Sequence, residues 1–130
     1  MTLTTPEELD ATSAATMAVL QSHMRAMSTM DPAVIAADYA EDCVVHTSFA
    51  EGPVVGRQGV EEWVETELPA MMQTLGAPRD GVEPVYTLTT LTANGEYGYL
   101  VVDLQNGAKG TETYHCRDGE ILFESATFFL

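Results

Sequence analysis

Polar residues in apolar surroundings are the clearest chemical signal in this chain. His23 lies at the edge of an apolar stripe on a predicted helix, and Glu112 lies in the middle of a predicted strand. Glu112 shares a strand face with Tyr114, because strand faces repeat every second residue. Glu124 occupies a similar apolar position in the next strand. Since burial raises the pKa of a carboxyl group towards values that suit an acid or a base, we predict Glu112 and His23 as catalytic residues.

Two structural interpretations compete with this hypothesis. His23 could be a core-edge histidine that hydrogen-bonds a backbone carbonyl. Glu112 and Glu124 could both face solvent if the strand faces are inverted. If Glu112 and His23 do share a cavity, we expect them to lie within direct or one-water hydrogen-bonding reach. A protonated His23 would then oppose the pKa shift of Glu112, and the two groups would titrate together.

The turn of the last hairpin decides whether Glu124 faces the same cavity. A two-residue turn at Asp118–Gly119 places Glu112 opposite Ser125, whereas a three-residue loop at Arg117–Gly119 places it opposite Glu124. A change of one residue in turn length moves every side chain of the last strand to the other face. In the second register two carboxyl groups share an apolar pocket, and one of them stays protonated near neutrality.

The elements that position these residues follow from turn signals. Asn94-Gly95, Asn106-Gly107 and Asp118-Gly119 recur at intervals of twelve residues. Each dipeptide supplies the positive-φ residues that tight hairpins need, and the segments between them are rich in strand-forming residues. We therefore predict a four-stranded antiparallel meander from Val82 to Leu130.

The first part of the chain, residues 1–76, is predicted to be mostly helical. Thr5–Glu8 has the cap, the proline and the acidic residues of a helix start. A short second helix is predicted at Asp31–Tyr39 and a short strand at Cys43–Thr47, and Gly56–Gly59 leads into a third helix. Pro69 removes a backbone donor inside that helix, so we predict a bend or a break near it. Helices followed by a meander indicate an α+β domain whose helices cover one face of a curved sheet and form a cup.

The amino-acid composition, above all the net charge, indicates which kinds of binding partner the protein can have. The chain has 130 residues, enough for one domain with its own core, and a formal net charge of −15 with only five basic residues. So acidic a protein repels phosphate backbones and anionic lipid, which argues against nucleic-acid and membrane partners. Cys43 and Cys116 lie in apolar strand contexts and are expected to be buried free thiols. Without a recognisable signal peptide or apolar span, we expect a cytoplasmic protein.

Several short motifs, in their order along the chain, resemble the NTF2-like superfamily, especially its SnoaL-like and ketosteroid-isomerase-like bacterial members. The motifs are a long first helix, Met30–Ala33 opening a short second helix, Tyr39–Val45, Gly56–Val60 before the third helix, and Arg117–Ile121 in the last hairpin. The resemblance implies one domain over residues 1–130, a cone-shaped cup of three N-terminal helices against a curved, mostly antiparallel sheet. Because the family commonly pairs through the uncovered face of the sheet, it also implies a homodimer.

The resemblance to ketosteroid isomerase extends to single positions. His23, sixteen residues before Tyr39, stands where that enzyme has its oxyanion-hole tyrosine, and Thr47, eight residues after Tyr39, stands where it has its catalytic aspartate. Glu112 corresponds to its protonated aspartic acid, in an alignment that favours the register with Glu124 opposite. Thr47 is no base for a carbon-bound proton, so a steroid-type isomerisation through it is not expected. In SnoaL-like cyclases an acid on the long strands does this work, which favours Glu112. The predicted pocket comprises Tyr39, Thr47, Trp63, Val64, Tyr99, Val101, Tyr114, Glu124 and Phe128.

The resemblance does not specify one activity, since the superfamily includes isomerases, cyclases, dehydratases, epoxide hydrolases and binding proteins. We expect an apolar cup that holds a small hydrophobic molecule, with Glu112 as acid or base and His23 as hydrogen-bond donor or proton partner. No cofactor is implied, and none of the three histidines has metal-ligand spacing in the sequence. The alternatives are a ligand-binding module without catalysis and a protein-interaction module of the same fold.

Overall fold

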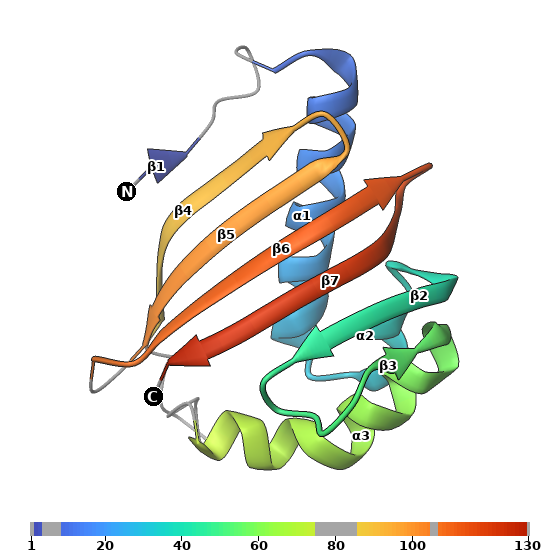
Figure 1. Cartoon of the computed structure of the whole chain (residues 1–130), viewed down its shortest axis with the longest axis vertical. Helices are drawn as coiled ribbons and strands as arrows, with labels where there is room; N and C mark the ends of the chain where they lie inside the picture. The colour runs from blue at the N-terminus through green and yellow to red at the C-terminus, as the bar shows by residue number, and fades with distance from the viewer. Residues whose placement is uncertain (1, 4–8, 75–85, 105–106, 130) are drawn as a thin grey trace.

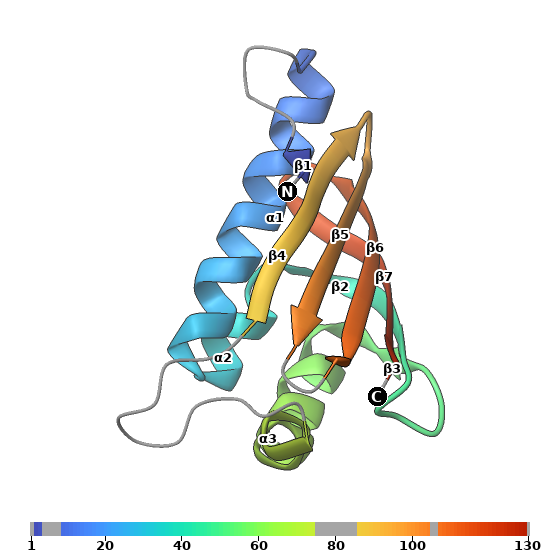
Figure 2. The ribbon, with the colours of Figure 1, turned by 90° about the vertical axis from the view of Figure 1, so that its left-hand side faces the viewer.

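A curved sheet crossed by one long helix forms the body of the molecule. The computed structural model describes residues 2–3, 9–74, 86–104 and 107–129. Within this part of the chain, seven strands form one sheet in the order β1-β4-β5-β6-β7-β2-β3. Helix α1 crosses the sheet on one face, called the inner face below, and α2 and α3 close one end (Figures 1 and 2). The elements are β1 (Thr2–Leu3), α1 (Ala11–Thr29), α2 (Pro32–Ala36), β2 (Tyr39–Thr47), β3 (Val54–Val55), α3 (Gly56–Thr74), β4 (Tyr86–Asn94), β5 (Tyr97–Leu104), β6 (Lys109–Arg117) and β7 (Glu120–Phe129).

The predicted α+β cup and its meander are confirmed. Strands β4, β5, β6 and β7 pair antiparallel in sequence order, while β2 joins β7 in parallel. Gly95 has φ 59°, Gly107 has φ 79° and Gly119 has φ 78°, as the turn dipeptides require. Asn106 lies outside the described residues. No helix in the described ranges is long and apolar enough to cross a membrane.

The boundaries of the first two helices differ from the prediction. Helix α1 begins at Ala11, where Asp10 acts as N-cap and accepts a hydrogen bond from the Ser13 backbone N–H at 2.7 Å. The predicted start at Thr5–Glu8 lies outside the described residues, and the described helix begins later than predicted.

The prediction that the second helix extends to Tyr39 is wrong. Helix α2 ends at Ala36, and Tyr39 opens strand β2 instead. Tyr39 is aligned with Ile121 of the parallel strand β7, and the Ile121 backbone N–H donates to the Asp38 carbonyl at 2.8 Å. This long-range pairing overrides the local helical pattern and turns the Tyr39 side chain inward, where it is 4% exposed.

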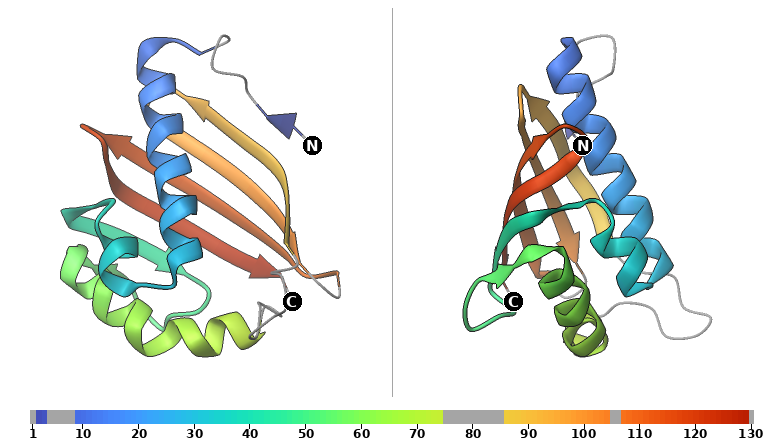
Figure 3. Two further views of the ribbon diagram at one scale, coloured as in Figure 1. Left: turned by 180° about the vertical axis from the view of Figure 1, so that it is seen from behind. Right: turned by 90° about the vertical axis from the view of Figure 1, so that its right-hand side faces the viewer.

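Of the predicted bend or break at Pro69, only the break is wrong, because α3 runs without interruption from Gly56 to Thr74. Its axis bends along its length rather than ending (Figures 1 and 3). Leu68 and Met71 stay buried on either side of the exposed proline, so the apolar face continues past it. Burial of that face against the core therefore maintains the helix despite the missing backbone donor.

Gly98 sets the distance between α1 and the sheet. A Cβ atom at this position would lie 2.5 Å from Cδ1 of Leu20, which is fully buried on α1. Only a residue without a side chain lets the helix approach β5 so closely. Because His23 is one helical turn after Leu20, this close approach also places His23 near the strands.

Candidate active site

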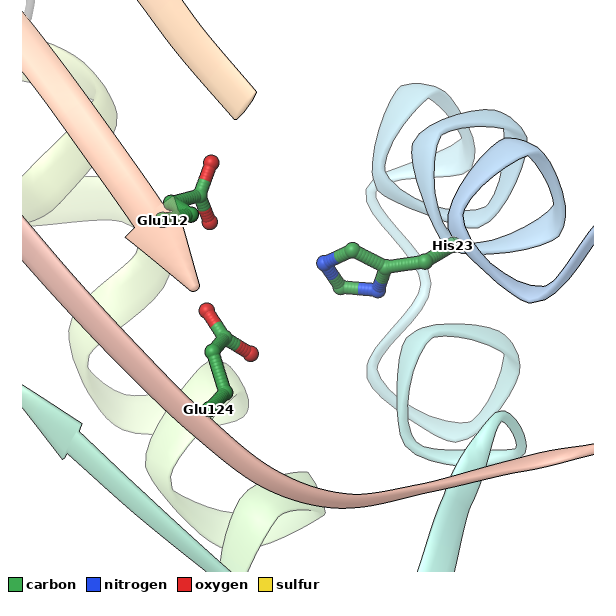
Figure 4. A group of neighbouring side chains, drawn as sticks. All are labelled: His23, Glu112 and Glu124. Atoms are coloured by element: carbon green, nitrogen blue, oxygen red, sulfur yellow. The ribbon is translucent and has the colours of Figure 1, made fainter. Parts of the chain in front are cut away.

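Three polar side chains converge from three elements on the inner side of the sheet. His23 projects from α1, Glu112 from β6 and Glu124 from β7, and Figure 4 shows their polar ends directed at one another. One nitrogen or oxygen atom from each lies within 4.8 Å of the others. His23 is 4% exposed and Glu124 is 5% exposed, while Glu112 is half-buried. The prediction that Glu112 and His23 lie within one-water reach is confirmed, and the solvent-facing alternative for both glutamates is wrong.

A β-bulge brings Glu124 into this site. The last turn has two residues, since Arg117 pairs with Glu120 and Cys116 with Ile121, so the favoured three-residue loop is wrong. The register then shifts between His115 and Cys116, with one extra residue in β7. This shift of one residue turns the Glu124 side chain back to the inner face, from which the two-residue turn alone would have directed it away.

The consequence of the bulge can be read from the pairing beyond it. Tyr114 pairs with Glu124, and Glu112 pairs with Ala126. Glu112 and Glu124 are therefore diagonal neighbours on the inner face rather than directly opposite. The prediction of two carboxyl groups in one site is confirmed, although the predicted register that led to it is not.

Each carboxyl group is held by one tyrosine hydroxyl. Tyr39 donates a hydrogen bond to Oε1 of Glu124, and Tyr114 donates to Oε1 of Glu112 at 2.8 Å. Both tyrosine side chains are buried. Their rings also contact the imidazole of His23, with centroid distances of 5.6 Å in both cases. The tyrosines thus fix the orientation of the acids and complete the wall around His23.

The backbone of Tyr39 is anchored from the other side by Arg57. The Arg57 Nε–H donates to the Tyr39 carbonyl at 2.7 Å, and Nη2 donates to Glu120 at 2.6 Å. Arg57 also lines a surface cavity of about 550 Å³, together with Ala40, Glu41, Asp42, Arg117, Asp118, Glu120 and Leu122. Neither His23, Glu112 nor Glu124 lines this cavity, so it is separate from the three converging side chains.

Burial and mutual repulsion favour one shared proton on the two carboxyl groups. Burial raises the pKa of Glu112 and raises that of Glu124 well above the ordinary value, and in Glu124 the charge of Glu112 adds to the effect. A hydrogen bond between the two carboxyl groups lowers the pKa of Glu112 and raises that of Glu124, and the tyrosine hydroxyls lower both. The shared proton therefore resides on Glu124, and Glu112 is the group that ionises first.

The pKa of His23 is lowered, so its imidazole is neutral near pH 7 and does not oppose the pKa shift of Glu112 as a protonated ring would. Burial lowers its pKa to about 4, because the site offers little solvation for an imidazolium. Its ring nitrogen farther from the backbone points towards the two carboxyl groups (Figure 4). Nδ1 is buried and has no hydrogen-bond partner among the described residues. An unpaired acceptor costs less than an unpaired N–H, so this favours the tautomer with the proton on Nε2, facing the acids.

Three ligand atoms at this spacing could also hold a metal ion. A metal on Nε2 of His23 would force the proton onto Nδ1, which is buried without an acceptor among the described residues. Metal-bound histidines nearly always donate their second N–H to a neighbouring acceptor. The donor set therefore fits a metal poorly, and the geometry favours hydrogen-bond and proton chemistry.

The predicted pocket residues divide into two groups. Tyr39, Tyr114 and Glu124 belong to the site. Val64 is buried in the core, while Thr47 accepts a hydrogen bond from the Phe49 backbone N–H, and Phe128 packs against the Phe49 ring. Trp63 is half-buried, and its Nε1–H is buried without a partner in the described part of the chain.

Tyr99 and Val101 were predicted to line the pocket, and this is wrong. Along β5 the buried residues are Gly98 and Leu100, so the alternate positions face outward, as the exposed Tyr97 does. Tyr99 is itself 40% exposed. No sequence signal distinguished the two faces of β5, because Tyr and Val are common on both faces of a sheet.

Three apolar side chains that continue the inner face and α1 beyond the site are only half-buried. Val102 follows Leu100 on the inner face of β5 and pairs with Leu88 of β4, and both side chains are half-buried. Met27, one turn after His23 on α1, is half-buried as well. Glu112 is half-buried as well, so these apolar side chains and Glu112 make up the partly exposed part of the inner face. No sequence signal distinguished them from ordinary core residues.

The pH dependence of stability tests the protonated state of Glu124. Because folding raises its pKa above the ordinary 4.5, its stabilising contribution is complete below that value and is lost as pH rises through the folded-state pKa. We expect the melting temperature of the wild type to fall with rising pH relative to that of Glu124→Gln, which is always neutral. Thermal unfolding at a series of pH values from below 4.5 upward measures the difference in melting temperature. Glu67→Gln, an exposed change of equal charge, is the control, and an identical slope in both variants would contradict the assignment.

Comparison with known proteins identifies the fold. No protein-family model matches the chain, and no curated protein gives a sequence match. Among solved structures, it is similar to an NTF2-like protein of unknown function from Mesorhizobium loti, with 18% identity, a TM-score of 0.70 and coverage of 100% of both chains. A steroid delta-isomerase from Pseudomonas aeruginosa has 17% identity, a TM-score of 0.66 and coverage of 94% of this chain and 82% of its own.

A third similar structure is an LEH-like epoxide hydrolase from M. tuberculosis, with 14% identity, a TM-score of 0.63 and coverage of 90% of this chain and 84% of its own. At such identities the likeness shows the fold alone. The fold is NTF2-like, as the sequence resemblance implied, and its structural relatives include both named enzymes and proteins of unknown function.

Proposed function

We propose that this NTF2-like domain binds a small hydrophobic molecule in its cup and performs acid/base chemistry on it. The observation that carries the proposal is the pair Glu112 and Glu124, whose polar ends meet beside the imidazole of His23 and whose pKa values are both raised, that of Glu124 more strongly. Glu112 acts as the base that accepts a proton from the substrate. Glu124 is the acid that returns one, and His23 supplies a hydrogen bond to the substrate or to the acids.

The environment supports this division of roles. Buried acids with different pKa values in one site are the usual basis for separate acid and base functions. Glu124 is the more deeply buried of the two and accepts from Tyr39, whereas Glu112 is half-buried. A substrate that enters from solvent therefore meets Glu112 first. Thr47 takes no part, since its hydroxyl lies in the turn after β2.

An assay with a general substrate for base catalysis tests the proposal without knowledge of the natural substrate. The ring of 5-nitrobenzisoxazole opens to a coloured nitrile-phenolate when a base removes its C–H proton and the N–O bond breaks, and a desolvated carboxylate accelerates this step. We expect turnover well above that of acetate at equal concentration, with Glu112 required. A β,γ-unsaturated ketosteroid and an alkyl epoxide, the classes named for two structural neighbours, extend the panel. A protein that is inactive on all three but binds apolar ligands would instead be a binding module.

We further propose that the protein forms a homodimer through the outer face of the sheet. Tyr97 is 60% exposed and Tyr99 is 40% exposed on this face of β5, where among the described residues no helix covers them. Large apolar surfaces of this kind usually mark an interaction site. Light scattering at micromolar concentration should give the mass of a dimer, and Tyr97→Lys should shift it towards a monomer. A monomeric wild type would contradict the proposal.

A further inference from the structure

The hydrogen-bonding inventory of the site indicates what kind of polar group its ligand carries. The hydroxyl groups of Tyr39 and Tyr114 both donate to carboxyl oxygens, and the Nε2–H assigned to His23 faces the same two acids. The acceptors are in surplus, because two carboxyl groups offer about eight lone-pair positions between them. A ligand that completes this inventory must bring donors. A carbonyl oxygen, which only accepts, would have to draw the His23 Nε2–H or the Glu124 proton away from the acid pair.

The charge of the site points in the same direction. The titratable groups that act on the acid pair are His23 from α1, Tyr39 and Cys43 from β2, and Tyr114 and Cys116 from β6. None of these groups is a cation at neutral pH. No described Lys or Arg forms an ion pair with either acid, although buried carboxylates are usually paired. The whole chain carries a formal charge of −15, which attracts cations to the site.

The surroundings of the acid pair suit an organic cation. The rings of Tyr39, Tyr114 and His23 lie beside the acids, and the half-buried apolar side chains of Leu88 and Val102 lie farther along the inner face. Aromatic rings stabilise ammonium groups, and the apolar side chains accommodate a hydrocarbon body. A bare metal ion makes no contacts with apolar side chains. Metal binding would also place an N–H on Nδ1 of His23, which has no acceptor among the described residues.

We infer that the ligand of this site is an apolar molecule with a protonated amine, whose N–H groups donate to Glu112 and Glu124. The inference rests on the proposed function and specifies its substrate class. When the ammonium binds, it replaces the shared proton, which passes to solvent, and both carboxyl groups become ionised. Glu112 then remains available as base, and the ammonium N–H supplies the proton that Glu124 holds in the free protein.

Three probes with one hydrocarbon body test the inference. The probes are 2-phenylethylamine, a cation; 2-phenylethanol, a neutral donor; and phenylacetone, an acceptor. Calorimetry at neutral pH should show the amine binding at least about tenfold more tightly than either neutral probe. In buffers of different ionisation enthalpy, amine binding should release a proton to the buffer, and the neutral probes should release none.

Matched variants show whether the preference for the amine over the neutral probes depends on Glu112 and Glu124. Glu112→Gln and Glu124→Gln should each remove most of the amine preference, while Glu67→Gln, an exposed acid on α3, should keep it. A ketone that binds as tightly as the amine, or a preference that survives both buried substitutions, would overturn the inference. Zinc chloride that displaces the amine, and whose binding requires His23 and both acids, would overturn it in favour of a metal centre.

The outcome is separable from that of the proposed function. Turnover of 5-nitrobenzisoxazole reports the base Glu112 and needs no amine. An active protein that prefers the ketone would overturn the inference alone, whereas an inactive protein that prefers the amine would overturn the catalytic proposal alone.

Discussion

Replacing Glu112 by glutamine should lower the turnover of 5-nitrobenzisoxazole by about two to four powers of ten. Glutamine keeps the size and shape of the side chain and can still accept from the Tyr114 hydroxyl, but it cannot take up a proton. The loss should therefore appear in kcat, with little change in KM. Steady-state kinetics of the wild type and the variant measure both parameters.

The controls for this experiment separate chemistry from folding. Glu67→Gln makes the same chemical change at an exposed position of α3 and should leave the rate unchanged. Glu124→Gln should retain part of the activity, because the residue replaced is the one that keeps its proton in the free protein. Equal rates for the wild type and Glu112→Gln in a folded protein would show that Glu112 is not the base.

Replacing Gly98 by alanine should destabilise the protein by about 1–3 kcal/mol, the usual cost of an added methyl group in a filled core. The new Cβ atom would lie 2.5 Å from Cδ1 of Leu20, which is fully buried. Either the helix must move away from β5 or the Leu20 side chain must leave its rotamer. Denaturant unfolding of the variant measures the loss.

A double-mutant cycle identifies the cause. Leu20→Ala alone should cost about 2–5 kcal/mol, as deletion of a buried leucine side chain usually does. If the two side chains clash as the structure indicates, the double variant should be less destabilised than the sum of the two single variants. Gly52→Ala is the matched control, since a Cβ there meets nothing within 4 Å. Additive losses at Gly98 and Leu20 would contradict the close approach of α1 to the sheet.

Local patterns in the sequence were sufficient for the architecture. The recurring Asn-Gly and Asp-Gly pairs predicted the meander, because a positive φ in a two-residue turn is a local requirement that tertiary contacts rarely override. Strand alternation also predicted that Glu112 shares a face with Tyr114, and helical spacing predicted the burial of His23. These residues converge because both periodicities direct side chains to the inner side of one cup.

Tertiary contacts decided the rest of the site. Tyr39 belongs to a strand because β7 offers a parallel partner that a local pattern cannot reveal. Glu124 reaches the inner face through a bulge in β7, and a bulge depends on how well both strands bury their side chains after a turn, not on the turn itself. The neutral state of His23 and the proton of Glu124 arise from burial, and burial exists only once α1, the sheet and the two tyrosines have packed together.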